Sequence, residues 1–276
     1  MIGKLYLIAT PIGNLEDITI RALNILKQVD LIAAEDTRHT LKLLNHFEIN
    51  KPLISYYKQT ENFKSEILIN KLLEGKNIGL VTDAGTPGIS DPGEVIVKEA
   101  IKNNIQVIPI PGACALVNAL IASGLNTNKF KFIGFLPVNQ GEKRQILEQI
   151  KYETNTLIFY EAPHKLVGTL STIYEEFGDR QCVLAKELTK IHEEFVRGSV
   201  SEVIDIIGEP KGEFVILIEG NSKTKQEVEI DNLNEKTLEE HYKYYEDLGL
   251  DKKEIIKKIA KDRKVNKNEI YKNFLN

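Results

Sequence analysis

The chain of 276 residues has no tryptophan, one methionine and two cysteines, and it contains no apolar run of membrane-spanning length. Cys114 and Cys182 lie in apolar segments and at no metal-ligand spacing, so we expect reduced, buried thiols, no metal site and a cytoplasmic location. The first residues run directly into a predicted strand, which predicts no cleaved leader. A formal net charge of −4 excludes a general affinity for nucleic acid and leaves only local contacts.

Signatures of several large enzyme classes are also missing. The loop at residues 9–15 occupies the position of a dinucleotide loop but lacks the G-x-G-x-x-G spacing, and no P-loop lysine follows it. His164 and His192 do not pair with a cysteine or serine in a nucleophile signature. The sequence therefore gives no support to NAD, ATP or acyl-enzyme chemistry.

Short aliphatic runs alternate with amphipathic segments over the first 220 residues. This alternation predicts an α/β fold with a mainly parallel sheet covered on both faces. The later strands are separated by too few residues for crossover helices, which predicts a mixed or antiparallel second sheet. We expect one domain over residues 1–113 and a second over residues 114–222. The predicted strands span residues 5–9, 31–34, 53–57, 78–81, 107–110, 130–136, 156–160, 183–185, 194–198 and 214–219.

The most informative segment is the loop at residues 82–93, which directly follows a predicted buried strand. Its three glycines and two prolines exclude regular structure until the second proline. A rigid loop at the carboxyl end of a strand is where α/β sheets bind ligands. We therefore expect close backbone contact with a ligand here, and Asp83 and Asp91 supply two carboxylates. Asp91 is also a candidate cap for the following helix.

Further loops at strand ends carry ionisable or small side chains. Charged residues follow the second strand at residues 35–38, and burial is costly unless they pair, so we expect Arg38 to neutralise Glu35 or Asp36. Small residues at 111–115 admit a ligand against the start of a helix. Residues 160–165 and 186–193 end two later strands in the same way.

The last part of the chain has a different composition. About fifteen polar residues after Asn221 predict a linker, and residues 235–276 are expected to form a helical basic tail. From Asp251 onward nine Lys or Arg stand against four Asp or Glu, a local excess of five. Asp251 is expected to cap a helix over residues 252–261, with a second short helix after residues 265–268. The pair resembles a helix-turn-helix, and both a solvated face and an RNA-contacting appendage stay open.

Six motifs in order resemble the tetrapyrrole methylase superfamily, and within it the enzymes that methylate the RNA of the small ribosomal subunit. The similarity covers about residues 1–220, and it departs at Cys114, where serine or threonine is expected, and at Lys165, where arginine is usual. The motifs are T-P-I-G-N-L at 10–15, A-E-D-T-R at 34–38, D-A-G-T-P-G-I-S-D-P-G at 83–93, P-G at 111–112, Y-E-A-P-H at 160–164 and E-L-T-K at 187–190.

The resemblance implies a class III methyltransferase fold, in which S-adenosylmethionine lies in a cleft between two α/β domains, and a homodimer with no membrane association. It also implies methyl transfer to the ribose 2′-oxygen of a cytidine in the decoding region of 16S rRNA, with the small ribosomal subunit as partner. Position by position, it implies cofactor contacts at Pro11, Ile12, Asp83, Ala84, Gly85, Thr86, Ile89, Cys114, Ala115, Tyr160, Glu161 and Leu188.

A ribose 2′-hydroxyl is a poor nucleophile, so a base within about 3 Å of it would help. Asp36 and Asp83 are preferred because both stand at strand ends that are expected to face the cleft. The full set of candidates is Glu35, Asp36, Asp83, Asp91 and Lys190.

Three basic residues, Arg38, Lys165 and Arg197, are candidates for holding RNA phosphates. Two alternative functions stay open at this point. One is a methyltransferase of the same fold that acts on a small tetrapyrrole, and the other is a non-catalytic RNA-binding protein.

Overall fold

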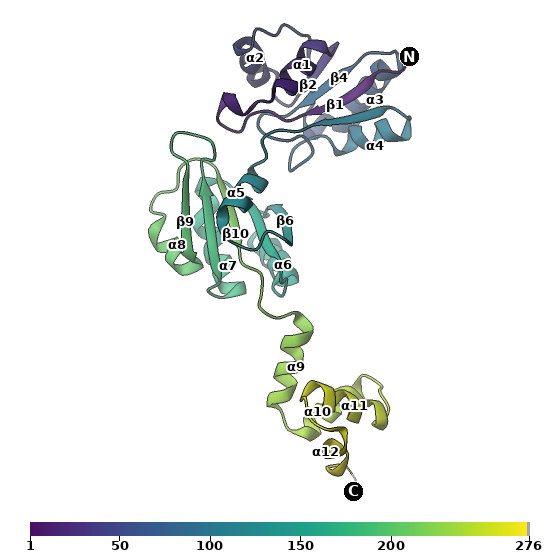
Figure 1. Ribbon diagram of the computed structural model, residues 1–276, viewed down its shortest axis with the longest axis vertical. Helices are drawn as coiled ribbons and strands as arrows, with labels where there is room; N and C mark the ends of the chain where they lie inside the picture. The colour runs from purple at the N-terminus through teal and green to yellow at the C-terminus, as the bar shows by residue number, and fades with distance from the viewer. Residues whose placement is uncertain (275–276) are drawn as a thin grey trace. The chain divides into compact units, whose positions relative to one another are not determined.

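The computed structural model describes residues 1–274, which divide into two compact units. The first unit comprises residues 1–147 and 156–219 and contains two separate five-stranded sheets. The second unit comprises residues 148–155 and the described residues from 220 to 274, and it is mainly helical (Figure 1). The expected division of the α/β part into domains at residues 113 and 114 stays a prediction.

The first sheet is entirely parallel, with strand order β3-β2-β4-β1-β5. Short aliphatic runs form its strands because both faces are covered by helices. Helices α1 and α2 pack on one face and α3 and α4 on the other (Figure 1). The strands are β1 (Lys4–Ile8), β2 (Leu31–Ala34), β3 (Leu53–Ser55), β4 (Ile78–Val81) and β5 (Gln106–Ile110), and the helices are α1 (Ile20–Gln28), α2 (Thr37–His46), α3 (Glu61–Leu73) and α4 (Glu94–Lys102), with 3-10 turns at Leu15–Asp17 and Lys58–Thr60.

The register of the first sheet decides where its loops lie. Ile78 of β4 is paired with Leu5 of β1 on one side and with Leu31 of β2 on the other. Parallel strands in register end at the same edge of the sheet, so the loops that follow β1, β2 and β4 emerge together. These are the three loops that the sequence singled out, at residues 9–15, 35–36 and 82–93.

The second sheet is mixed, as the strand spacing predicted, with order β6-β7-β10-β8-β9 and only β6 and β7 parallel. Helix α5 packs on one face through Leu116 and Leu120, which contact Ile158 and Leu217 in one apolar cluster. The strands are β6 (Phe130–Phe135), β7 (Thr156–Glu161), β8 (Gln181–Lys186), β9 (Glu194–Ser199) and β10 (Phe214–Ile218), and the helices are α5 (Ala115–Ser123), α6 (Gln140–Ile150), α7 (Pro163–Phe177) and α8 (Val200–Ile206).

The helical unit has its own apolar core, built from residues such as Leu233, Tyr245, Ile256 and Ile259. Asp251 caps α11 in a capping box with Glu254, as predicted. The helices are α9 (Lys225–Glu235), α10 (Leu238–Asp247), α11 (Lys252–Asp262) and α12 (Lys267–Lys272).

Two expectations about the secondary structure were wrong. The polar stretch after Asn221 is not a linker throughout, because Thr224 and Glu227 form a capping box that starts α9. The charged segment after β2 is not a loop beyond Asp36, because the Asp36 side chain accepts from the Arg38 amide and starts α2. Between residues 1 and 274, no helix is both long and apolar enough to span a bilayer.

Candidate functional site

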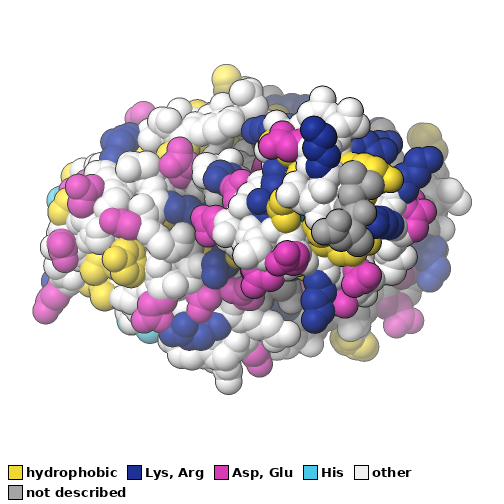
Figure 2. All heavy atoms as spheres, turned by 90° about the horizontal axis from the view of Figure 1, so that it is seen from below, with side chains coloured by type: hydrophobic (Ala, Val, Ile, Leu, Met, Phe, Trp, Pro, Cys, Tyr) yellow, Lys and Arg dark blue, Asp and Glu magenta, His cyan; other side chains and the backbone are white. Residues whose placement is uncertain are grey.

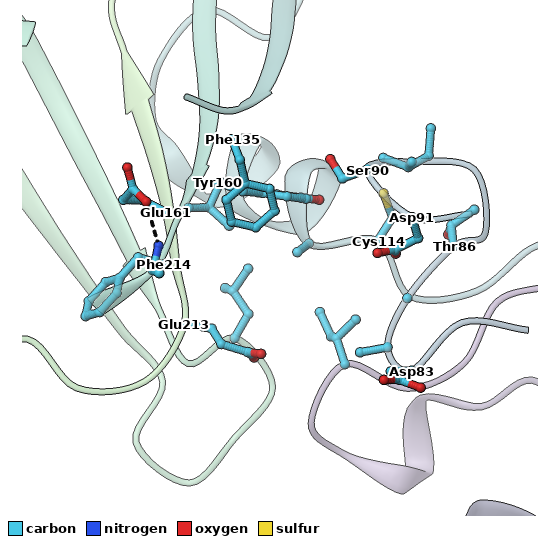
Figure 3. A pocket seen from close by; sticks show the side chains of 18 of the residues that line it. Asp83, Thr86, Ser90, Asp91, Cys114, Phe135, Tyr160, Glu161, Glu213 and Phe214 are labelled. Carbon is cyan, nitrogen blue, oxygen red and sulfur yellow. Dashed lines mark hydrogen bonds between the residues drawn. The ribbon is translucent and has the colours of Figure 1, made fainter. Parts of the chain in front are cut away.

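A cavity of about 440 Å³ lies within the first unit, where loops from the ends of both sheets meet (Figure 3). Its walls are mostly small or apolar side chains interrupted by carboxylates. The lining residues come from the loops after β1, β2, β4, β5, β7 and β8, and from the ends of β6 and β10. Every strand-end segment that the sequence marked as a binding loop contributes at least one of them.

The loop at residues 82–93 has the backbone that its composition predicted. Gly85 has φ +85° and Gly88 φ +81°, conformations that strain any residue with a Cβ. Ser90 also has a positive φ, +68°, although it is not a glycine. Such strain persists only where the surrounding structure enforces it, and it is common at ligand sites. Helix α4 starts at Glu94 after Gly93 as N-cap, so the expectation that Asp91 caps this helix was wrong.

Backbone and hydroxyl hydrogen bonds tie this loop to its neighbours. Thr10 and Gly85 exchange two backbone bonds of 2.9 and 3.1 Å, which join the loop after β1 to the loop after β4. The Thr86 hydroxyl donates to the carbonyl of Ala113 at 3.0 Å, which fixes the small-residue loop before α5. The three loops therefore form one continuous, mostly backbone wall, as a ligand held by main-chain contacts requires.

The connection between β8 and β9 is held from several sides. Glu187 and Thr189 have φ of +50° and +66°, so two non-glycine residues are strained here. The Glu187 carboxylate accepts from the Glu213 amide and from Lys190 Nζ, each at 2.9 Å. Lys190 Nζ also donates to the Glu213 carboxylate at 2.9 Å. This ion-pair network positions Leu188 and Glu213, which both line the cavity.

Tyr160 and Glu161 at the end of β7 form the opposite wall. The Tyr160 hydroxyl accepts from the Leu116 amide at 3.1 Å, and burial raises the pKa of Tyr160 to about 12, so the phenol stays neutral. Glu161 is buried, and it accepts from the Thr169 hydroxyl at 2.6 Å. Thr169 in turn accepts from the buried Lys143 ammonium at 2.8 Å, so a hydroxyl links a buried cation to the wall of the cavity.

The charges on the cavity wall are all of one sign. Five carboxylates line it, and no Lys, Arg or His does so within the described chain. Burial and then the Glu35 and Asp83 charges raise the pKa of Asp91 to about 7. Burial and the Asp83 charge also raise the pKa of Glu35. The cavity therefore favours a cationic ligand and disfavours phosphates and other anions.

Most of the predicted cofactor contacts lie together at this cavity. Of that set, Pro11 alone does not line it. The cofactor role of each residue stays a prediction. The predicted residues that line the cavity are Ile12, Asp83, Ala84, Gly85, Thr86, Ile89, Cys114, Ala115, Tyr160, Glu161 and Leu188.

Of the preferred bases, Asp83 lines the cavity and Asp36 does not. The Asp36 carboxylate accepts from the Arg38 amide and guanidinium, which holds its pKa well below the usual range. The Asp36 amide donates to Asp83 Oδ1 at 3.0 Å, so Asp36 orients Asp83 through its backbone. Glu35 lines the cavity, whereas Lys190 is used in the ion pairs described above. The expectation that Asp36 faces the cleft is thus corrected.

The three residues predicted to hold phosphates have different surroundings. Arg38 is highly exposed and pairs with Asp36, as the sequence predicted for that segment. Lys165 is half-buried in the first turn of α7. Arg197 donates to the carbonyls of Ala122 and Ser123, so its guanidinium caps the end of α5. The RNA-binding role of Arg197 stays a prediction, with part of its guanidinium used in these bonds.

Several lining residues escaped the sequence-based prediction. Phe214 is paired with Glu161 because β10 inserts between β7 and β8, and no local pattern announces that strand order. Phe135 ends β6 and carried no distinguishing motif. The residues that were missed as cofactor or catalytic candidates are Ser90, Phe135, Ala162, Pro163, Ala185, Glu213, Phe214 and Val215, and Asp91 was considered only as a possible base or cap.

Solved structures with a similar fold include methyltransferases and a synthase. Diphthine synthase matches 82% of this chain and 94% of its own, with a TM-score of 0.62 and 15% identity. The uroporphyrin-III C-methyl transferase of Thermus thermophilus complexed with S-adenosyl homocysteine matches 79% of this chain and 97% of its own, with a TM-score of 0.56 and 18% identity. The fold is thus that of a class of two-sheet α/β methyltransferases.

The sequence comparisons identify the family. The model of the tetrapyrrole (corrin/porphyrin) methylases matches residues 4–204. Proteins named ribosomal RNA small subunit methyltransferase I are 50% identical in Halalkalibacterium halodurans and 48% identical in Bacillus subtilis, each over 98% of this chain and 93% of the relative. The chain belongs to the tetrapyrrole methylase family, as the six motifs predicted.

Metal binding has no structural support in residues 1–274. No group of three or more His, Cys, Asp or Glu side chains there has a geometry that would hold a metal ion. Cys182 is buried, and burial raises its thiol pKa to about 12, whereas Cys114 lines the cavity.

Proposed function

We propose that the protein transfers a methyl group from S-adenosylmethionine to the ribose 2′-oxygen of a cytidine in the decoding region of 16S rRNA. Relatives up to 50% identical, matched over nearly the whole chain, carry names that place their action on small-subunit ribosomal RNA. The single structural observation that carries the proposal is the cavity at the strand ends, which is lined by carboxylates and by no Lys, Arg or His among the described residues.

The residues at this cavity fit S-adenosylmethionine. A sulfonium and an ammonium are both cations, and the lining offers carboxylates with no competing Lys, Arg or His among the described residues. The left-handed Gly85 brings backbone atoms to the wall, and the Leu188 and Ala115 side chains add apolar surface.

The bound cofactor would supply a methyl group that is already activated. With the cofactor bound, its sulfonium would give the methyl group to the 2′-oxygen and leave as a neutral thioether, and the hydroxyl proton would pass to a base of the protein. The protein therefore has to align the two reactants, exclude water and accept one proton. The carboxylates of Glu35, Asp83 and Asp91 are the candidate bases, because Asp36 and Lys190 are held in ion pairs.

RNA contacts are proposed to be local. On the face seen in Figure 2, Lys and Arg side chains are interspersed with Asp and Glu, and they form no continuous basic surface. Helix α11 is an exception, since Lys253, Lys257 and Lys261 recur every four residues, are exposed and form no ion pair within residues 1–274. Such a row is suited to contact successive phosphates, and we assign it the RNA-contacting role of the basic tail.

A homodimer completes the proposal. Val117 and Ile121 lie one turn apart on α5, and they are 45% and 69% exposed. Burying this face against a second copy would remove it from water. An Ile121→Glu substitution is expected to yield monomers, as measured by light scattering. A cytoplasmic location follows from the proposed substrate.

Two linked assays test the proposal. Calorimetry is expected to show one S-adenosylmethionine site for each chain, which Asp83→Asn weakens and the surface control Asp179→Asn does not. Small subunits from a strain that lacks this gene are expected to accept labelled methyl groups from the purified protein. Cofactor binding without transfer to small subunits would reject the RNA substrate, and no cofactor binding would favour a non-catalytic RNA-binding protein.

A further inference from the structure

Phe135 is an exposed aromatic residue at the cavity. It lines the cavity, and yet its side chain is 60% exposed. Its ring makes an edge-type contact with Tyr160, with centroids 5.6 Å apart, and Tyr160 in turn contacts Phe132 in the same way. The ring is thus anchored by Tyr160 while most of its surface stays open. An exposed, anchored aromatic ring at a ligand cavity indicates a flat, apolar partner.

Asp91 is a carboxylate without a hydrogen-bond donor. No side chain or backbone amide within residues 1–274 donates to it, and it does not cap α4. Of the other two cavity acids of the first sheet, Asp83 accepts from the Asp36 amide at 3.0 Å, and the Asp83 backbone acts to lower the pKa of Glu35. Asp91 is therefore the carboxylate that is free to accept a proton from a bound substrate.

Phe135 and Asp91 come from different sheets and meet at one corner of the cavity. A Cβ placed on Gly134 would lie 3.4 Å from Ser90 Oγ, so the end of β6 lies against the residue before Asp91. The Asp91 charge also contributes to the raised pKa of Tyr160, which contacts Phe135. In Figure 3, Ser90 lies between the Phe135 and Tyr160 rings on one side and Asp91 and Cys114 on the other. We call Phe135, Ser90 and Asp91 the nucleoside corner.

We propose that the nucleoside corner binds the target nucleoside, with Phe135 stacking on the base and Asp91 accepting the proton of the ribose 2′-hydroxyl. This inference rests on the proposed function. RNA-binding proteins commonly splay a base out of its stack and hold it on an aromatic ring. The base then fixes the ribose, and the ribose hydroxyl faces a carboxylate that has no other partner.

Proton balance and charge are consistent with this role. The 2′-oxygen gains the methyl carbon, sulfur keeps the electrons of the broken bond, and Asp91 becomes a neutral acid that releases its proton to water after product leaves. The groups that face Asp91 are the Glu35 and Asp83 carboxylates, the Tyr160 phenol and the Cys114 thiol. None of them is a cation, so the repulsion from the two carboxylates favours proton uptake at Asp91.

The test uses the full chain with four variants and three measurements. The variants are Phe135→Ala, Phe135→Tyr, Asp91→Asn and a control, Val138→Ala, which is exposed after β6 and does not line the cavity. The measurements are the S-adenosylmethionine Kd by calorimetry, the Kd for small subunits with S-adenosylhomocysteine present, and kcat against pH.

Phe135→Ala is expected to weaken subunit binding about tenfold, because it removes the aromatic ring on which the base stacks. Phe135→Tyr keeps such a ring and is expected to bind subunits about as tightly as wild type. Asp91→Asn is expected to lower kcat at least about 100-fold, as loss of a general base does, and to remove the fall in rate below about pH 7. Phe135→Ala, Phe135→Tyr and the control should keep the cofactor Kd within about twofold.

Unchanged subunit affinity in Phe135→Ala would overturn the stacking role, and so would a loss of cofactor affinity there, since the ring would then belong to the cofactor. A wild-type pH profile in Asp91→Asn would overturn its role as base. These results are distinct from failure of the proposed function, in which the wild-type chain itself would not bind the cofactor or methylate small subunits.

Discussion

Replacing Asp91 by asparagine is expected to stabilise the folded protein at alkaline pH. Asp91 has a pKa raised from an ordinary 3.8 to about 7 in the fold, so the folded state binds the proton more tightly than the unfolded chain. The contribution of Asp91 to the free energy of unfolding is therefore full below pH 3.8, and it is lost progressively as the pH rises to about 7. Asparagine has the same shape and carries no charge, so it does not suffer this loss.

The magnitude follows from the change in pKa. A rise in the pKa of Asp91 from 3.8 to about 7 corresponds to a change of about 4 kcal/mol in the free energy of unfolding if it acts in full, since one pKa unit is worth about 1.4 kcal/mol. Asp91 is only partly buried and solvent screens the carboxylates around it, so we expect about half, roughly 2 kcal/mol. Asp91→Asn should therefore exceed wild type by about 2 kcal/mol at pH 8 and by little at pH 4.

Urea unfolding followed by far-UV circular dichroism measures this difference, because the chain has no tryptophan for fluorescence. Asp179→Asn is the matched control, and its effect on the free energy of unfolding is expected to have the opposite sign. Asp179 accepts from the Ser201 amide and hydroxyl, which lowers its pKa, so its substitution should destabilise the protein at pH 8 and have less effect as the pH falls. An Asp91→Asn excess that does not depend on pH would refute the electrostatic reasoning.

Three further predictions concern the walls of the cavity and the basic helix. Thr169→Val keeps the volume but leaves the Lys143 ammonium buried without its partner, so unfolding measurements should show a loss of about 3 kcal/mol. Gly13→Ala places a Cβ 2.5 Å from Lys190 Cγ and 2.9 Å from Thr189 Oγ1, so urea unfolding should show a loss of about 1–3 kcal/mol, and calorimetry should show weaker cofactor binding because Leu188 is displaced with them. Reversing the charge of Lys253, Lys257 and Lys261 together should weaken small-subunit binding and reduce its log–log salt slope by about two to three, while cofactor affinity stays unchanged.

The sequence was sufficient to predict where ligand-binding loops gather, because that placement follows from the topology. Residues 9–15, 35–36 and 82–93 each follow a short aliphatic run, and parallel strands bring their carboxyl ends to one edge. The turns of this loop could also be predicted, since Gly85 and Gly88 adopt the left-handed backbone that other residues avoid.

Sequence reasoning misplaced the residues whose side-chain positions are set by hydrogen-bond and ion-pair partners. Asp36 and Asp83 look alike as strand-end acids, and only the capping of α2 with its ion pair to Arg38 turns the Asp36 carboxylate away from the cavity. Lys190 is diverted in the same way by Glu187 and Glu213. These choices depend on short-range geometry that residue type does not determine.

Phe214 and Phe135 were missed for a different reason. Phe214 reaches the cavity because β10 inserts between β7 and β8, a strand order set by packing across the whole second sheet. Phe135 reaches it because the loop around Ser90 lies against the end of β6. Both contacts join segments that are far apart in the chain, and no local pattern in a single sequence predicts them.

The most direct test of the central claim is the position of the transferred methyl group. Small subunits from a strain that lacks this gene would be incubated with the purified protein and deuterium-labelled S-adenosylmethionine, and the 16S rRNA would be digested and sequenced by mass spectrometry. The account predicts a trideuteromethyl group on the ribose of one cytidine in the decoding region. Label on a base, on another nucleoside or absent from the RNA would contradict it.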